Sequence, residues 1–160
     1  MSASEWLGYE AKDNFSGFTG VVIAFSEYLD SSPRVSIAKQ TEDEKENKPR
    51  TFDISSVSKI GEEPKFAPVV RDFPPLIQLG QQVKDRLTEF EGIAIAMATF
   101  LSGCRRVAVQ PTTLFEGRLI HEELLDESRW IVQTPTPIER HNTDTGGPGD
   151  DFAEATDYSF

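Results

Sequence analysis

The sequence contains a second copy of one of its own segments, and this repeat constrains the fold more than any other feature. Residues 79–109 align with residues 7–37 at a constant offset of 72, without a gap, and 11 of the 31 aligned positions are identical. A missed repeat would mis-assign the whole architecture, so the repeat is the starting point for predicting the fold. We expect two equivalent folded halves.

The repeated unit has the residue pattern of a β-strand. In residues 93–98 the large side chains of Ile93, Ile95 and Met97 alternate with alanines, and residues 21–26 show the same alternation of large and smaller residues. A period of two places the large side chains on one face of a strand and the small ones on the other. The small face either lets another layer approach closely or is simply exposed.

Each unit is predicted to contain five short strands. Gly20 and Gly92 begin the long strand after a turn, where a missing Cβ tolerates a bulge or a positive φ. Turn residues then precede a third short strand in each copy. The fourth and fifth strands are expected at Thr51–Ile54 and Val57–Ile60 in the first copy, and near Leu119 and at Trp130–Val132 in the second. Five short strands in about 55 residues are typical of a small barrel.

The predicted fold is therefore mainly β, with two tandem small barrels and an extended C-terminal arm. The predicted boundaries are 1–60 for the first barrel, 61–78 for a proline-rich packed linker, 79–132 for the second barrel and 133–160 for an acidic arm. The prolines of the linker disfavour helix, and its many apolar side chains need burial. We expect the linker to be a strap packed across both barrels.

Charge and motifs argue against several classes of function. The net charge of −11 argues against nucleic-acid binding, which depends on clustered Lys and Arg. The sequence has no phosphate-binding loop, nucleophile elbow, paired histidines or Cys-x-x-Cys. We therefore expect no enzyme activity, cofactor, metal or small-molecule substrate. The single Cys104 is predicted to be buried or half-buried filler, and His121 and His141 to face solvent. We expect no secretory leader, and the sequence has no stretch of about 18 apolar residues, so no membrane contact is expected.

Two stretches are predicted to bind a partner. Leu114 and Phe115 lie in the loop 111–118, where they either dock a partner or fold back onto their own barrel. Residues 141–160 carry five acidic residues and no Lys or Arg. Within this acidic tail, the aromatic rings are predicted to anchor the arm on a neighbouring protein. These rings belong to Phe152, Tyr158 and Phe160. Arg34 and Arg106, which recur at matched positions, are predicted to brace a turn.

The second copy resembles a group of short proteins encoded by tailed bacteriophages and prophages. The resemblance covers residues 83–111 and rests on Lys84, Asp85, Phe90, Gly92, Ala94, Phe100, Leu101, Gly103, Cys104, Arg106, Val109, Gln110 and Pro111. The first copy departs from this pattern, with Ser32 in place of the cysteine and Lys39-Gln40 in place of the last two residues. The unit is also similar to SH3-like barrels of the KOW and Tudor kind.

This resemblance implies a function without chemistry. It points to a virion structural protein of the head-decoration, head-completion or connector type, which binds other virion proteins and forms homo-oligomers. Such a protein would be made in the host cytoplasm and located in the virion. The alternative is a phage accessory protein that acts in the host cell, where it binds a host regulator, a nucleotide or a nucleic acid. Barrels of this kind have many unrelated roles, so the fold alone does not decide between them.

Overall fold

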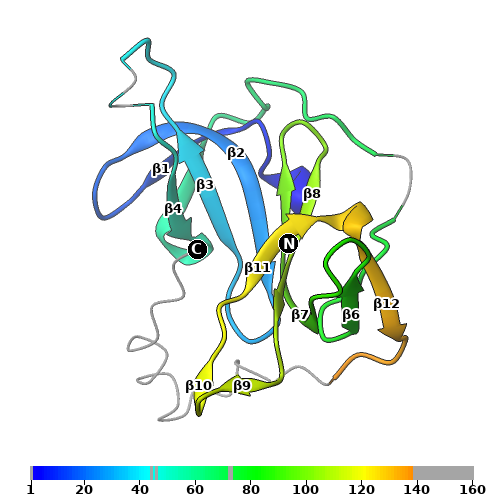
Figure 1. Ribbon diagram of the computed structural model, residues 1–160. Helices are drawn as coiled ribbons and strands as arrows, with labels where there is room; N and C mark the ends of the chain where they lie inside the picture. Colours follow the sequence, from blue (N-terminus) through cyan, green and yellow to red (C-terminus); the bar gives the residue numbers. More distant parts are fainter. Residues whose placement is uncertain (1, 44, 46, 72–73, 139–160) are drawn as a thin grey trace.

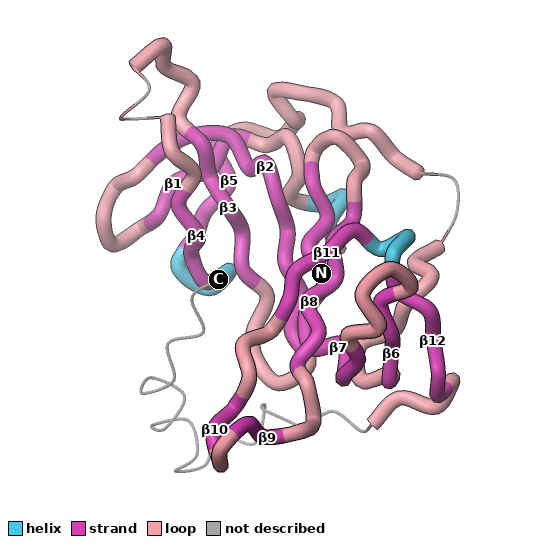
Figure 2. Tube along the Cα trace, in the orientation of Figure 1, coloured by secondary structure: helices cyan, strands magenta, loops and turns pink. Residues whose placement is uncertain are grey.

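The chain folds mainly into β-strands in the computed structural model, which describes residues 2–43, 45, 47–71 and 74–138 (Figures 1 and 2). The strands of the first half are β1 Glu10–Asp13, β2 Thr19–Tyr28, β3 Arg34–Ala38, β4 Arg50–Asp53 and β5 Val57–Ile60. Those of the second half are β6 Gln82–Asp85, β7 Glu91–Phe100, β8 Arg105–Gln110, β9 Leu114–Phe115, β10 Arg118–Leu119, β11 Glu123–Asp126 and β12 Trp130–Thr134. Three short 3-10 helices, each of one turn, are also present: η1 Ala3–Glu5, η2 Ile54–Ser56 and η3 Glu127–Arg129. The predicted mainly β class is confirmed. Within the described ranges, no helix has the length and apolar character needed to cross a membrane.

The two halves pair their strands in the same order and register. The order is β5-β1-β2-β3-β4 in the first half and β12-β6-β7-β8-β11 in the second. In the β1–β2 ladder Glu10 faces Val21, and in the β6–β7 ladder Gln82 faces Ile93, each shifted by the sequence offset of 72. Even the register shift recurs, after Val22 in β2 and after Ala94 in β7.

Neither half closes into a barrel, which corrects the predicted barrel closure. In the part of the chain that the structure describes, no ladder joins β4 to β5 or β11 to β12, and all strands other than β9 and β10 form one continuous ten-stranded sheet. The turns η2 and η3 lead the chain from β4 to β5, and from β11 to β12, at opposite edges of each half. The two halves are joined elsewhere, through the long strands β2 and β7.

The joint between the halves follows from the unequal lengths of β1 and β2. Residues 19–21 of β2 pair with the short strand β1, whereas residues 24–28 of the same edge pair with β7. A ten-residue strand beside a four-residue neighbour leaves backbone N–H and C=O groups that need partners. The equivalent stretch of β7 supplies these partners, so the halves share one hydrogen-bonded sheet.

Each half has its own apolar core. The first core contains Leu7, Ala11, Phe18, Val22, Phe25, Val35, Ile37, Ile54 and Val57. The second contains Ile77, Val83, Ala94, Met97, Val107, Val109 and Trp130. The indole of Trp130 also donates a hydrogen bond of 3.2 Å to the carbonyl of Val107, so this large side chain is buried without leaving its N–H group unsatisfied.

The linker contacts both halves through its backbone more than through its side chains. The N–H groups of Lys65 and Phe66 donate to the carbonyl of Gly8, and that of Val69 donates to Leu101. Its described apolar side chains are mostly exposed, by 40% for Phe66, 59% for Val69, 73% for Val70 and 60% for Leu76. Only Ile77, at 2%, is fully buried among them. The expected burial of this apolar set is therefore wrong for four of its members, because hydrogen bonds hold the segment.

Two further expectations are corrected by the ladders. The fourth strand of the second half is β11, whereas Leu119 belongs to the separate β9–β10 hairpin. Gly20 and Gly92 have neither a positive φ nor the register shift, which lies further along the strand. They are needed for close backbone approach instead: an added Cβ would lie 2.3 Å from the Ala38 carbonyl oxygen or 2.2 Å from that of Gln110.

Candidate functional site

The seam between β2 and β7 relates the two halves by a local pseudo-twofold axis. Ala24 faces Phe100 and Tyr28 faces Ala96, and the offset of 72 converts each of these pairs into the other. Ser26 and Ala98, which are themselves equivalent positions, face each other at the centre. The seam thus has the geometry of an isologous dimer interface built within one chain.

Both ends of the seam are closed by equivalent hydrogen bonds. The N–H group of Leu29 donates to the carbonyl of Ile95, and that of Leu101 donates to the carbonyl of Ile23, each over 2.8 Å. Ile23 and Ile95 are the residues at the register shift, which leaves their carbonyls outside the regular ladders. The irregularity of each long strand is therefore used to bind the other half.

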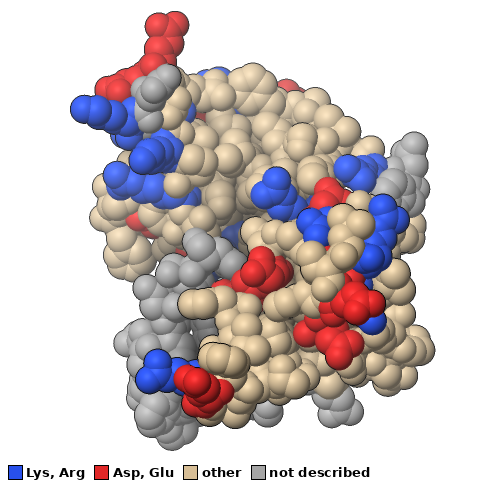
Figure 3. Space-filling view, viewed as in Figure 1, with Lys and Arg blue, Asp and Glu red and all other residues tan. Residues whose placement is uncertain are grey.

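The small-residue face of the seam lines a groove of about 280 Å³. Alternate residues of a strand point to opposite faces, so the even-numbered positions of β2 and β7 share this face. The groove is lined by Ala24, Ser26, Tyr28, Arg34, Ser36, Thr51, Ala96, Met97, Ala98, Phe100 and Leu124. Figure 3 shows the face that carries β3 and β11, with Lys and Arg side chains near its centre. Two interpretations of the small residues follow from the sequence, namely close approach of another layer or simple exposure. Neither describes this arrangement, in which the small residues form the floor of a groove.

An arginine lies over an aromatic ring at equivalent places on the two sides of the groove. The guanidinium of Arg34 is 5.5 Å from the ring centre of Tyr28, and that of Arg106 is 5.6 Å from the ring centre of Phe100. Both distances are within the range of a cation–π interaction. The two arginines thus pack across the β2–β3 and β7–β8 hairpins, in keeping with the predicted bracing role. Burial raises the pKa of Tyr28, so its hydroxyl stays protonated at neutral pH.

The predicted binding pair Leu114 and Phe115 is on the surface. These residues form β9, which pairs only with β10 in a small separate sheet (Figure 1). Leu114 is 59% exposed, Phe115 67% and Leu119 of β10 76%. Leu114 and Leu119 are also cross-strand partners. The hairpin therefore does not fold back onto its own half, and it presents an apolar surface to solvent. The other predicted anchors, Phe152, Tyr158 and Phe160, lie outside the described residues, as does His141.

Sequence reasoning missed a matched pair of exposed apolar residues. Phe15 is 90% exposed at the tip of the β1–β2 turn, and Leu87 is 69% exposed at the equivalent position of the β6–β7 turn. The signal that would have revealed them is their spacing of 72 residues, although the two residue types differ. Such large apolar side chains at turn tips are accessible to a partner.

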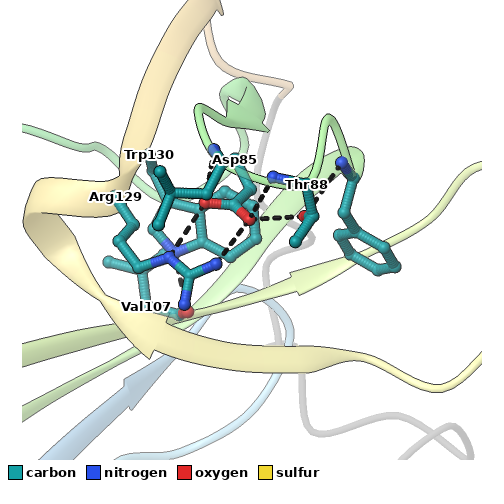
Figure 4. Close-up of polar contacts among 7 residues, drawn as sticks. Asp85, Thr88, Val107, Arg129 and Trp130 are labelled. Atoms are coloured by element: carbon teal, nitrogen blue, oxygen red, sulfur yellow. Dashed lines mark hydrogen bonds and ion pairs between the residues drawn. The ribbon is translucent and has the colours of Figure 1, made fainter.

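Both turns are held by a buried aspartate. Asp13 accepts hydrogen bonds from the backbone N–H and hydroxyl of Ser16, and Asp85 does the same with Thr88. Asp85 also binds the guanidinium of Arg129, at 3.0 Å to Nε and 2.7 Å to Nη2 (Figure 4). The two aspartates, which lie at matched positions of the repeat, thus hold equivalent turns.

These contacts favour the charged form of each aspartate. The hydrogen bonds from Arg129, and then from Thr88, hold the pKa of Asp85 well below its usual range. Hydrogen bonds from Ser16 lower the pKa of Asp13 in the same direction. Both carboxylates are therefore ionised at neutral pH and act as fixed acceptors, which is the behaviour of a structural group. A group poised for proton transfer has a pKa near the working pH.

The remaining chemically reactive residues have structural or solvent-facing positions. Cys104 is half-buried, as predicted, and its thiol donates to the Asp126 carboxylate over 3.4 Å. Burial and this carboxylate raise the pKa of the thiol, so it stays protonated and weakly nucleophilic. His121 is exposed. In the part of the chain with described coordinates, no three His, Cys, Asp or Glu side chains gather in a way that could hold a metal ion.

Comparison with known proteins gives no relative for this chain. A scan against models of protein families, a search of curated proteins and a search of solved structures each found no match.

Proposed function

We propose that this chain is a non-enzymatic virion component that acts through protein–protein contacts. It would be a head-decoration, head-completion or connector protein of a tailed phage, made in the host cytoplasm and assembled with other virion proteins and with copies of itself. We further propose that each half is an SH3-like unit, open in this chain, because its two halves repeat one strand order at a fixed offset.

The observation that carries the proposal is the exposed apolar β9–β10 hairpin. Three large apolar side chains, Leu114, Phe115 and Leu119, are each more than half exposed on one short hairpin. The first half has the loop 39–49 at the equivalent place, and that loop contains no large apolar residue. Clustered apolar residues on a soluble surface typically mark an interaction site. The hairpin is therefore a feature of the second half alone, added to a shared framework.

The charge distribution supports a protein partner over a nucleic acid. The chain carries 27 acidic and 16 basic residues, which opposes close approach to phosphates. The aspartates that recur in the two halves hold turns and are committed to structure. A surface that offers apolar contacts within an acidic protein suits a partner that presents an apolar pocket with a basic rim.

The test is the composition of purified particles. If the proposal holds, mass spectrometry of particles of the encoding phage finds the protein at high copy number. The variant Leu114→Ser/Phe115→Ser should fold normally and be lost from the particles, because it removes the apolar contact. The matched control is Ile131→Ser, which removes a similarly exposed aliphatic side chain from β12, and it should still be incorporated. A wild-type protein found in infected cells and missing from particles would reject the virion role and favour the host-acting accessory protein.

A further inference from the structure

The groove at the pseudo-twofold seam has a chemical character that is unusual for this chain. Among the described residues that line it, Arg34 is the only charged one, and the floor is made of the alanines 24, 96 and 98. Arg106 adds a second cation above Phe100 at the other side. The chain as a whole carries a net charge of −11, so a groove lined by a cation and no anion stands apart from it.

Such a groove suits a short ligand with aromatic and acidic groups. A floor of small residues leaves room for a flat ring, and the rings of Tyr28 and Phe100 offer edges or faces for aromatic contact. A guanidinium forms strong, directional hydrogen bonds with a carboxylate. A volume of about 280 Å³ lies at the lower limit for ligand sites, so the occupant is a short piece of chain.

The sequence supplies a segment with this character. Residues 139–160 lie beyond the described part of the chain and contain two acid–aromatic dipeptides, Asp151-Phe152 and Asp157-Tyr158. At the groove, Arg34 and Tyr28 form one arginine–aromatic pair in the lining, and Arg106 forms the equivalent pair with the lining residue Phe100. The acidic groups of the tail are opposite in charge to the arginines at the groove. The tail has two acid–aromatic dipeptides, and the groove has two arginine–aromatic pairs.

The end of the described chain is close enough to reach the groove. The N–H group of Ile138 donates to the carbonyl of Gly80, whose own N–H donates to Ala94 of β7. Ala96, two residues along β7, lines the groove. The 13 residues from Ile138 to Asp151 span up to about 43 Å when extended, which exceeds the distance across a domain of this size. A tether of this length gives the segment an effective concentration of order mM at the groove, which favours its own chain over a second copy.

We propose that the groove at the β2–β7 seam binds the acidic, aromatic C-terminal segment 150–160 of the same chain. Asp151 and Asp157 face the two guanidiniums, and the neighbouring rings of Phe152 and Tyr158 lie on the small-residue floor. This inference rests on the proposed function in one respect, namely that the tail rings are binding groups. The groove and an external partner then compete for the same side chains.

The test uses the full-length isolated protein and needs no phage partner. A nitroxide is attached at Ser159→Cys in a Cys104→Ser background, and the loss of amide signal at Ser26 and Ala98 is measured by NMR. We expect a strong loss at these groove residues that is relieved by salt, because screening weakens the exposed charge pairs. As a second measurement, protein that carries the nitroxide but no isotope enrichment is mixed with isotope-enriched protein that has no nitroxide. The signal loss should then disappear, because the contact is within one chain.

Charge reversal in the tail tests the specificity of the contact. The variant Asp151→Lys/Asp157→Lys should abolish the signal loss at the groove. The control Asp144→Lys/Glu154→Lys makes the same change of net charge at acids with no following aromatic residue, and it should keep most of the loss. The inference is overturned if the groove signals never weaken, if they weaken equally in the mixture, or if the two variants behave alike. None of these results depends on whether the protein enters a particle.

Discussion

The two halves share one framework and differ in how they support the same turns. In the first half, Asp13 is held by Ser16, and Ser56 contributes a weaker contact that also lowers the Asp13 pKa. In the second half, Arg129 takes the place of that serine and makes two hydrogen bonds to Asp85. A neutral serine contact in one copy thus corresponds to a partly buried ion pair in the other, and both hold the same turn.

A second pair of matched positions shows the same divergence. In the first half, Ile54 is buried in the apolar core, and its backbone N–H donates to the Pro33 carbonyl over 3.0 Å. The equivalent residues of the second half are Arg105 and Glu127, which form a 3.2 Å ion pair with both side chains buried. The Glu127 carboxylate also accepts from the backbone N–H of Leu76.

This difference determines which half contacts the linker through these side chains. Ile54 of the first half packs within the core of its own half. The ion pair of the second half also holds the linker, through Leu76 and through the Pro74 carbonyl, which accepts from Arg105 over 3.5 Å. The second half thus has charged groups at these positions, and they hydrogen-bond the backbone of the linker, which an apolar side chain cannot do.

The largest expected effect comes from breaking this ion pair. Glu127→Ala leaves the buried Arg105 guanidinium without its carboxylate, and we expect a loss of about 3–5 kcal/mol in the free energy of unfolding. Urea denaturation measures it. Restoring the character of the first half with Arg105→Met/Glu127→Ile should recover most of this stability, because an apolar pair of similar volume often replaces a buried ion pair at no cost. A double variant as unstable as the single one would show that the linker contacts, more than the charges, set the stability.

The next largest expected effect is the difference in stability between variants of the two turn aspartates. Asp85→Asn should destabilise the protein more than Asp13→Asn, because only Asp85 also binds an arginine. Both native pKa values are lowered, so each carboxylate stabilises the fold fully above the unfolded-state value of about 3.9. That contribution is lost as the pH falls through the lower, folded-state pKa.

Acid titration of the same two variants checks that this contribution to stability is lost as the pH falls. The stability gap between the wild type and Asp85→Asn should be constant near neutral pH and shrink as the pH falls below about 4. The gap for Asp13→Asn should shrink in the same direction from a smaller starting value. Equal gaps at neutral pH would contradict the view that Arg129 distinguishes the two halves.

The sequence was sufficient to predict the long strands of each half, but it did not reveal the β2–β7 ladder that joins the halves. Alternation in residues 21–26 and 93–98 identified the long strands, because side-chain period is a local property. The barrel closure was wrong because it requires β4 to pair with β5 and β11 with β12, and residue pattern does not determine which strands pair. The joint was missed because it depends on β1 and β6 having four residues beside ten-residue neighbours, and strand ends are poorly defined by pattern alone.

The candidate sites divide in the same way. Leu114 and Phe115 were recognised as a surface pair because they interrupt a polar loop, which is a local signal. The groove was missed because its lining comes from both halves and depends on the β2–β7 register. The linker was misjudged because apolar composition predicts burial, whereas backbone hydrogen bonds can hold a segment whose side chains stay exposed.

The smallest expected effect lies at the ends of the two turns. Gly17 has a φ of 76°, and the equivalent Glu89 has a φ of 65°, so the second half places a side chain in the left-handed region. This conformation costs a residue with a Cβ about 1–2 kcal/mol, and glycine relieves it while losing about 0.4–1 kcal/mol through the unfolded state. Glu89→Gly should therefore raise the free energy of unfolding by up to about 1 kcal/mol.

The control must separate this backbone effect from the side-chain charge. Glu89 is 3.8 Å from the Lys84 ammonium in an exposed ion pair, which contributes about 0–1 kcal/mol. Glu89→Gln removes the charge and keeps the left-handed strain, so Glu89→Gly should be the more stable of the two variants in urea denaturation. The reverse change, Gly17→Ala, should destabilise the first half by about 1 kcal/mol, since an added Cβ meets no atom there and only the backbone strain remains. A Glu89→Gly protein less stable than Glu89→Gln would show that the second turn has adapted to its side chain, and that the two turns are no longer equivalent.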